Sequence, residues 1–257
     1  MAVVPMFVLA VLAGAFIALG AAFATTVAAG AAGELPYGII RLVAGVAFSL
    51  GLSLVIVGGA ELFTGNNLLA MAWAAGRIDA RSIVRNWGIV YAGNLVGAVA
   101  TAILIVGSGQ YLFGDGAVGA TALGTAAAKT SLDPLRAFVL GVLCNGLVCL
   151  AVWLTYSART TTDRILAIIP PIAAFVAMGF EHSVANMYFI PVGILIRALA
   201  PADFWESIGQ TAADYPTVDL AGLVGNLVPV TLGNIVGGTI LVAAVYWLVY
   251  LRDTGRR

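Results

Sequence analysis

Two eight-residue segments, far apart in the chain, decide the fold. They are Gly59-Ala60-Glu61-Leu62-Phe63-Thr64-Gly65-Asn66 and Gly179-Phe180-Glu181-His182-Ser183-Val184-Ala185-Asn186. Glycine, glutamate and asparagine occupy the same offsets in both. Each segment lies near the middle of an apolar window, from Leu42 to Gly76 and from Ile165 to Ile196, and both windows exceed one straight membrane span. The pattern predicts two interrupted helices.

The composition around these segments is that of an integral membrane protein. Of 257 residues, 61% are apolar and 9% are charged, and the formal net charge is zero. A soluble domain carries about a quarter charged residues. Charge-free windows at 1–33, 86–114, 137–158 and 220–251 join the two interrupted ones, which predicts an all-α protein of six transmembrane helices. A cytosolic enzyme and a nucleic-acid-binding protein are excluded, the latter because no basic excess exists.

A second pair of motifs extends the repeat. Gly93-Asn94-Leu95-Val96-Gly97 in the third predicted span recurs as Gly233-Asn234-Ile235-Val236-Gly237 in the sixth. The chain is therefore predicted to be one domain, 1–257, with two three-span halves at about 1–110 and about 130–252. Because three is odd, the halves cross the membrane in opposite directions, as in the inverted repeats of transporters and channels. Permeation is expected between the interrupted helices.

Loop charges predict the orientation. Most of the 12 basic residues lie between spans two and three, between spans four and five, and at the C-terminus: Arg77, Arg81, Arg85, Arg159, Arg164, Arg252, Arg256 and Arg257. The positive-inside rule places these segments, and both termini, in the cytoplasm.

The two intramembrane glutamates, Glu61 and Glu181, need partners because a carboxylate is costly at the bilayer centre. Their matched positions favour a structural role, in which each accepts hydrogen bonds from freed backbone amides or from Asn94 or Asn234. An ion-conducting role is the alternative.

His182 breaks the repeat, because Leu62 occupies its place in the first half. An unperturbed imidazole titrates near pH ~6.5, so this single histidine is suited to exchange a proton with a weak acid. A buried structural histidine is the alternative. Thr64 lies at the end of the opposite segment, where its hydroxyl could reach the same point or only bond its own helix.

Lys129, the only lysine, is predicted to lie in the outward loop before span four and to stay charged there. It could attract an anion to an entrance or simply be solvated. Phe48, Leu52 and Phe175 could form apolar constrictions, although helix packing explains them equally well. Cys144 and Cys149 are expected to pack in the core. No motif for a cofactor, a metal or a catalytic triad occurs, so neither a cofactor nor enzymatic activity is expected.

The chain resembles the formate/nitrite transporter family over essentially its whole length. Four motifs carry the resemblance: residues 58–66 (GGAELFTGN), 144–153 (CNGLVCLAVW), 179–187 (GFEHSVANM) and 226–234 (NLVPVTLGN). The resemblance implies an aquaporin-like six-helix protomer, a homopentamer with one pore per protomer, and a bacterial inner membrane location among lipid. It implies transport of formate, nitrite, hydrosulfide or a related small monovalent anion, with protons as partners. Residues 190–197 and 246–252 look most like formate channels.

The resemblance also assigns residues to roles. The family's pore histidine falls on His182, its threonine on Thr64 and its outer-vestibule lysine on Lys129. The family's outer constriction falls on Phe48, Leu52 and Phe175, and its inner constriction falls on Leu62, Phe63 and Val148. Two family asparagines fall on Asn145 and Asn186. A cytoplasmic helix before the first span is missing from this sequence, which argues against pH gating by such a segment. An aquaporin-like pore for neutral solutes is the alternative function, disfavoured because it needs neither His182 nor Lys129.

Overall fold

The computed structural model describes residues 1–252, and its secondary structure is helical apart from one isolated bridge. Arg256 and Arg257, two predicted cytoplasmic residues, lie outside the described residues. The α-helices are α1 (Val3–Ala28), α2 (Tyr37–Gly58), α3 (Leu69–Ala74), α4 (Ala80–Gly107), α5 (Ala117–Thr130), α6 (Pro134–Thr155), α7 (Thr161–Ala177), α8 (Ser183–Leu199), α9 (Ala202–Ile208) and α10 (Leu220–Val236). Short 3₁₀ helices are η1 (Gly65–Leu68), η2 (Gln110–Leu112) and η3 (Ala212–Asp214). After α10 the chain continues in π-helical geometry as η4 (Gly237–Ala244) and η5 (Trp247–Leu251).

Within residues 1–252, five helices are long and apolar enough to cross a membrane: α1, α2, α4, α6 and Leu220–Leu251. The pair α8 and α9, bent by 114°, raises the number to six if it is counted as one span. The predicted all-helical membrane protein is therefore confirmed at the level of five to six candidate spans.

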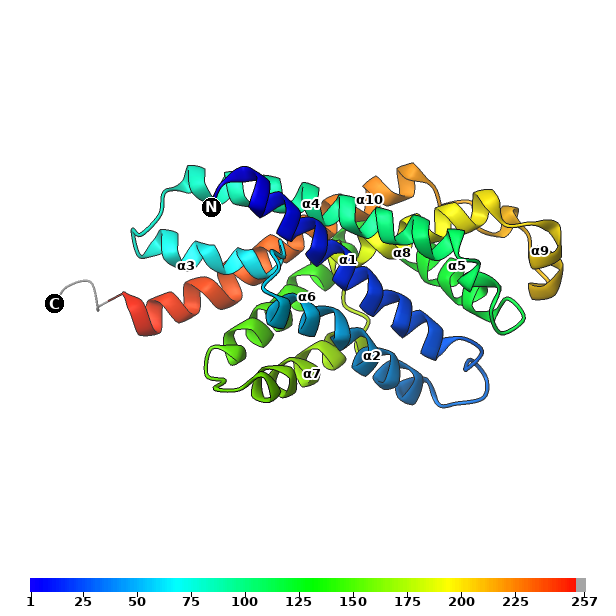
Figure 1. Cartoon of the computed structure of the whole chain (residues 1–257), viewed down its shortest axis with the longest axis horizontal. Coiled ribbons are helices and arrows are strands. Elements are labelled where there is room, and N and C mark those ends of the chain that lie inside the picture. Colours follow the sequence, from blue (N-terminus) through cyan, green and yellow to red (C-terminus); the bar gives the residue numbers. More distant parts are fainter. Residues whose placement is uncertain (253–257) are drawn as a thin grey trace.

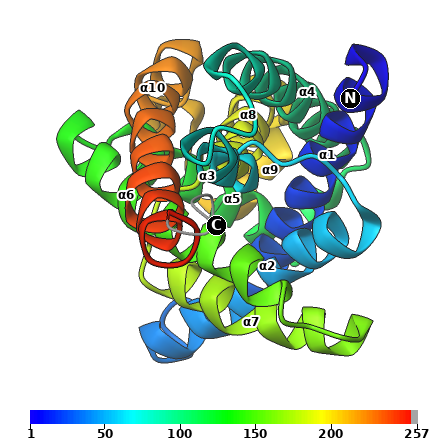
Figure 2. The ribbon, with the colours of Figure 1, turned by 90° about the vertical axis from the view of Figure 1, so that its left-hand side faces the viewer.

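Six helices form the outline of the molecule when it is viewed along its long axis. The helices α4, α1, α2, α7, α6 and α10 contact one another in that order (Figure 2). Helix α8 contacts both α4 and α10 and so closes the ring, while α3 and α5 lie inside the outline in this view. The two segments that hold the repeated motifs, residues 59–66 and 179–186, therefore meet in the interior.

The N-terminus, the end of η5 and the α3–α4 connection lie at one end of the molecule, and α9 lies at the other (Figure 1). The Asp79 side chain caps α4 at the first of these ends by accepting a hydrogen bond from the Ser82 amide at 2.8 Å. Hydrogen bonds from Ser82 hold the pKa of the Asp79 carboxyl below its ordinary value.

Glycines allow two helix pairs to touch backbone to backbone. A Cβ atom at Gly97 of α4 would lie 1.9 Å from the Val11 carbonyl oxygen of α1. At Gly237, which follows α10, a Cβ atom would lie 2.1 Å from the Val142 carbonyl oxygen of α6. The two Gly-Asn-x-Val-Gly motifs therefore make the same kind of close contact in the two halves, as small residues do between membrane helices.

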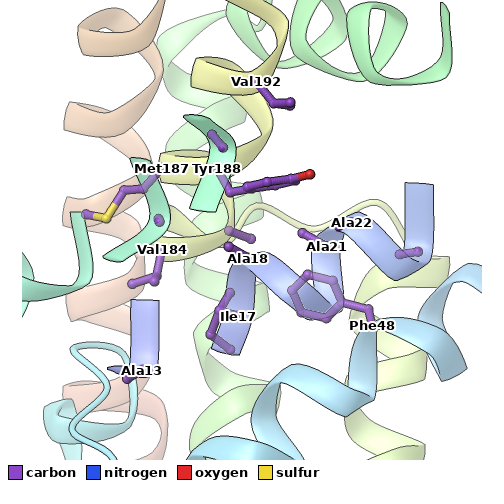
Figure 3. Close-up of a cluster of buried hydrophobic side chains, with 14 of the residues drawn as sticks. Ala13, Ile17, Ala18, Ala21, Ala22, Phe48, Val184, Met187, Tyr188 and Val192 are labelled. Atoms are coloured by element: carbon purple, nitrogen blue, oxygen red, sulfur yellow. The ribbon is translucent and has the colours of Figure 1, made fainter. Parts of the chain in front are cut away.

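Helix α1 packs against α8 through a face of small residues. Ala13, Ala18 and Ala21 are fully buried against Val184 and Met187, and the ring of Phe48 lies beside them (Figure 3). The small alanine side chains allow α8 to pack closely on α1 near the start of α8, which follows His182.

The predicted outward loop around Lys129 is wrong as a local structure. Residues 117–130 form α5, a 14-residue helix that packs against α8. Its alanines favour a helix, but at ~1.5 Å per residue it is too short to span a bilayer, so the search for long apolar windows missed it.

Candidate functional site

Helical structure stops at two places that face each other in the interior. The first break, residues 59–64, follows α2, and the second break, residues 178–182, follows α7. Each begins near a left-handed glycine, with φ of 69° at Gly59 and 73° at Gly179. That conformation costs a residue with a Cβ atom about 1 kcal/mol or more, which explains the repeated glycine.

Two asparagines hold the breaks through matched hydrogen bonds. Asn94 Oδ1 accepts from the Phe63 amide at 2.9 Å, and Asn94 Nδ2 donates to the carbonyls of Glu61 and Ala10. In the second half, Asn234 Oδ1 accepts from the Ser183 amide at 2.9 Å. Its Nδ2 donates to the carbonyls of Glu181 and Gly141. These bonds satisfy backbone groups that lipid could not.

The two breaks meet at Thr64 and His182. Thr64 Oγ1 lies 2.9 Å from His182 Nε2, and the two side chains are 0% and 2% exposed. The sequence predicted that the threonine hydroxyl could reach the histidine, and the structure brings the two groups together. This contact is the only place where polar side chains of the two breaks bond each other within residues 1–252.

The second ring nitrogen of His182 defines the tautomer. Nδ1 accepts a hydrogen bond from the Ala185 amide at 3.1 Å and so caps the N-terminus of α8. A backbone N–H can only donate, so Nδ1 carries a lone pair and the ring proton resides on Nε2, directed at Thr64 Oγ1. His182 is therefore neutral in this arrangement, and a proton added at Nδ1 would break the cap.

Glu181, beside His182, belongs to a buried polar cluster. Its Oε1 accepts from Lys129 Nζ at 2.8 Å, and its Oε2 accepts from Asn186 Nδ2 at 2.6 Å. Asn186 Nδ2 also donates to Asn226 Oδ1 at 2.7 Å. The Lys129 side chain is only 14% exposed, and its ammonium lies 5.3 Å from the centre of the Phe189 ring. The alternative of a solvated Lys129 is wrong, because the carboxylate of Glu181 holds the ammonium inside the protein.

Glu61 has a smaller set of partners. Its Oε2 accepts from Asn66 Nδ2 at 2.6 Å, and Asn66 Nδ2 also donates to Asn86 Oδ1. No cation lies within ion-pair distance of Glu61 among the described residues. The expectation that Asn94 and Asn234 would bond the two carboxylates is wrong. Those asparagines bond the backbone, and the carboxylates bond the asparagine five residues downstream.

A cavity of about 70 Å³ lies on the α9 side of the contact and is lined by Phe48, Phe175, Lys129, Arg41, His182 and Asn186. The rings of Phe48 and Phe175 meet edge to face, with centroids 5.5 Å apart. Phe175 also stacks on His182 at 5.9 Å. Two of the three predicted outer constriction residues therefore border the cavity that contains the histidine, while Leu52 is buried at 1% exposure and does not line it.

The predicted inner constriction residues do not line this cavity. Leu62, Phe63 and Val148 are each at most 3% exposed. The Phe63 ring packs edge to face on Tyr91 and on Trp87. A cavity of about 680 Å³ opens beside η1 and α3 and is bordered by Arg77 and Trp247.

Asn145 connects the first break to the end of α10. Its Nδ2 donates to the carbonyl of Thr64 at 3.2 Å and to that of Asn234 at 2.7 Å. Its Oδ1 and the Oδ1 of Asn186 are buried acceptors without a partner in the described structure. The thiol of Cys149 donates a hydrogen bond to the carbonyl of Thr64 at 3.4 Å. Both Cys144 and Cys149 are free and buried, as predicted.

Two site residues were missed as functional candidates. Asn226 carries the link between Asn186 and Lys129, through a bond from its Nδ2 to the Lys129 carbonyl at 2.9 Å. Asn226 is the first residue of the fourth family motif, so the sequence already contained a reason to consider it. Arg41 borders the cavity that contains His182, and little in the sequence points to it because it lies just outside the apolar window that begins at Leu42.

Comparisons with known proteins identify the family of the chain. The family model described as formate/nitrite transporter matches residues 1–248. The formate channel FocA of Escherichia coli K12 is 44% identical over 248 residues, which cover 96% of this chain and 87% of that protein. FocA of Haemophilus influenzae is 47% identical over 231 residues, with coverage of 90% and 81%. A solved pentameric formate channel with formate bound superposes with a TM-score of 0.92 at 43% identity, covering 97% of this chain and 98% of that one.

The fold and the site define a multi-pass membrane protein of the channel and transporter class, with polar groups assembled where helices stop inside the protein. Within that class, the chain belongs to the formate/nitrite transporter family. The predicted family is confirmed.

Proposed function

We propose that this protein is a formate channel of the bacterial inner membrane, assembled as a homopentamer with one pore in each protomer. The relatives named formate channels and the pentameric structure with formate bound support the substrate and the assembly. The observation that carries the proposal is the buried contact between Thr64 Oγ1 and His182 Nε2, which joins the two breaks beside a cavity. Nitrite and hydrosulfide are the alternative substrates.

The pathway runs from the outer cavity, past Thr64 and His182, to the inner cavity beside α3. Phe48, Leu52 and Phe175 form the outer constriction, and Leu62, Phe63 and Val148 form the inner one. Their burial supports this, because such apolar rings exclude hydrated ions. Asn145 and Asn186 contribute free amide oxygens beside the pathway, which suit a substrate that carries an O–H donor.

Formate crosses as formic acid, because a bare anion pays many kcal/mol to leave water whereas desolvation raises the pKa of a weak acid. His182 mediates this neutralisation. Its ring takes a proton from water on Nδ1 by giving up the Ala185 amide, and the Nε2 proton then passes to a formate oxygen to give formic acid. A second proton taken from water on Nε2 and the loss of the Nδ1 proton to water restore the resting ring, so that one proton is consumed for each formate. The N-cap bond and the contact with Thr64 support this role, since they hold the resting ring neutral with its proton aimed at the pathway.

The two halves of the chain form an inverted repeat with an aquaporin-like arrangement, in which α2–α3 and α7–α8 are the interrupted spans. The twofold occurrence of the asparagine bonds and the glycine contacts supports this arrangement. Glu61 and Glu181 act as structural anchors of the breaks. Both termini face the cytoplasm. The α3–α4 connection, which contains Arg77, supports this because it lies at the same end of the molecule as the N-terminus and η5 (Figure 1).

The substrate test is uptake of labelled formate, nitrite, hydrosulfide and glycerol into proteoliposomes at two pH values, with protein-free liposomes subtracted as the leak. We expect saturable formate uptake that rises as the external pH falls, and no protein-dependent glycerol uptake. Glycerol uptake without formate uptake would make the protein a neutral-solute pore instead. Preference for nitrite or hydrosulfide would keep the mechanism and change the substrate.

A further inference from the structure

Arg41 on the second turn of α2 places a guanidinium at the outer cavity. It lines the same cavity as Lys129 and His182, and its side chain is half-buried. Arg41 Nη2 donates to the Val176 carbonyl, and Nε lies 3.5 Å from the Ala177 carbonyl, both at the C-terminal end of α7. These carbonyls fix the guanidinium beside the second break.

The charges at the cavity do not contribute equally. Lys129 is paired with Glu181 at 2.8 Å, so together they add no net charge to the cavity. Among residues 1–252, no carboxylate oxygen lies within 4.0 Å of the Arg41 guanidinium. Its partners are carbonyl dipoles, which orient it and offset only part of a unit charge. Arg41 is therefore the uncompensated cation at this entrance.

The guanidinium also has donors to spare. It carries five N–H groups, and two contacts are made to the end of α7. A planar carboxylate can accept two parallel bonds from such a group, which a lysine ammonium does not offer.

We infer that Arg41 is a specificity-determining residue that draws small carboxylate anions from the outside into the cavity, the role that the sequence alone gave to Lys129. This inference rests on the proposed function. The attraction is electrostatic, so it acts on substrate capture. It weakens with salt, because the screening length falls from about 30 Å at 0.01 M to about 8 Å at physiological ionic strength.

The test compares initial rates of formate uptake by wild type, Arg41→Gln, Arg41→Lys and the control Arg136→Gln in proteoliposomes. Arg136 is an exposed arginine in the first turn of α6 and does not line this cavity. We expect Arg41→Gln to raise the half-saturating formate concentration roughly three- to tenfold at low ionic strength, with a nearly unchanged maximal rate. The difference should shrink at high salt. Arg41→Lys should recover the part of the capture that depends on salt but not the part that depends on two parallel bonds to the carboxylate, and Arg136→Gln should behave as wild type.

Three outcomes would overturn the inference. The first is an unchanged half-saturating concentration in Arg41→Gln at every salt concentration. The second is an equal, salt-independent loss of maximal rate in Arg41→Gln and Arg41→Lys, which would show that the arginine only caps α7. The third is an equal effect of Arg136→Gln. In each case formate uptake by wild type would still support the channel, whereas absence of uptake by wild type would overturn the proposed function itself.

Discussion

At the scale of single residues, Lys129 and Glu181 form the one ion pair of the described chain, and it is buried. Removal of one partner leaves an uncompensated charge in a dry site, which typically costs about 3–5 kcal/mol, while removal of both charges is far less harmful. The pair therefore holds α5 to the second break, and it stabilises the protein only while both partners are present.

This pair gives a stability prediction. Lys129→Gln should lower the melting temperature of the detergent-solubilised protein, because Glu181 loses its cation. The double variant Lys129→Gln with Glu181→Gln should recover much of that loss. Glu61→Gln is the matched control, since Glu61 has no cation within ion-pair distance in residues 1–252, and it should shift the melting temperature little. A double variant no more stable than Lys129→Gln would contradict the explanation.

Thr64 gives a prediction about rate. Thr64→Val keeps the shape but removes the hydroxyl that lies 2.9 Å from His182 Nε2. A lost hydrogen bond of about 1–1.5 kcal/mol corresponds to a maximal formate uptake rate about tenfold lower at every substrate concentration and salt level.

The matched control for Thr64 is Thr101→Val in α4. That hydroxyl is also buried but bonds only its own helix, at the Gly97 carbonyl. Uptake by this variant should stay near the wild-type rate. Equal rate losses in the two valine variants would show that Thr64 has no special place on the pathway.

At the scale of helices, the Gly-Asn-x-Val-Gly motifs combine two functions in five residues. Gly97 and Gly237 let the backbones of neighbouring helices touch, and Asn94 and Asn234 bond the exposed backbone of the breaks. The close approach is what brings each asparagine within reach of its break, so packing and capping depend on each other.

Alanine substitution tests this dependence. Gly97→Ala and Gly237→Ala should each destabilise the protein by about 1–3 kcal/mol, because the new Cβ atom would overlap a carbonyl oxygen of the neighbouring helix. Gly88 lies on α4 with Gly97, and Gly225 lies on α10, which ends just before Gly237. A Cβ atom at either position meets nothing within 4 Å, so Gly88→Ala and Gly225→Ala should be neutral or slightly stabilising. Melting temperatures of the four variants provide the comparison, and four equal shifts would contradict it.

At the scale of the whole molecule, the repeated motifs and the apolar windows were enough to predict the helical membrane fold and the two breaks. The glycines, the glutamates and the Asn94 and Asn234 motifs indicated the breaks, and the family motifs indicated the family. The partners of Glu181 could not be predicted, because Lys129, Asn186 and Asn226 come from three different helices. Their approach depends on how α5 packs against α8, which no pattern in one sequence encodes. Helix α5 itself was missed because it is too short to resemble a span.

The central claim is that formate crosses between the two breaks as the neutral acid, after His182 has donated a proton to it. His182→Asn tests it, because asparagine is a good N-cap for α8 but offers no titrating ring. The variant should assemble as the wild type does.

The measurement is simultaneous uptake of formate and protons into proteoliposomes over a range of external pH, with the leak through protein-free liposomes subtracted. Wild type should take up about one proton per formate and accelerate as the external pH falls, because each formate crosses as the neutral acid. His182→Asn should lose this acceleration and most of the proton uptake. Undiminished, pH-dependent uptake of formate with protons by an intact His182→Asn protein would contradict the claim.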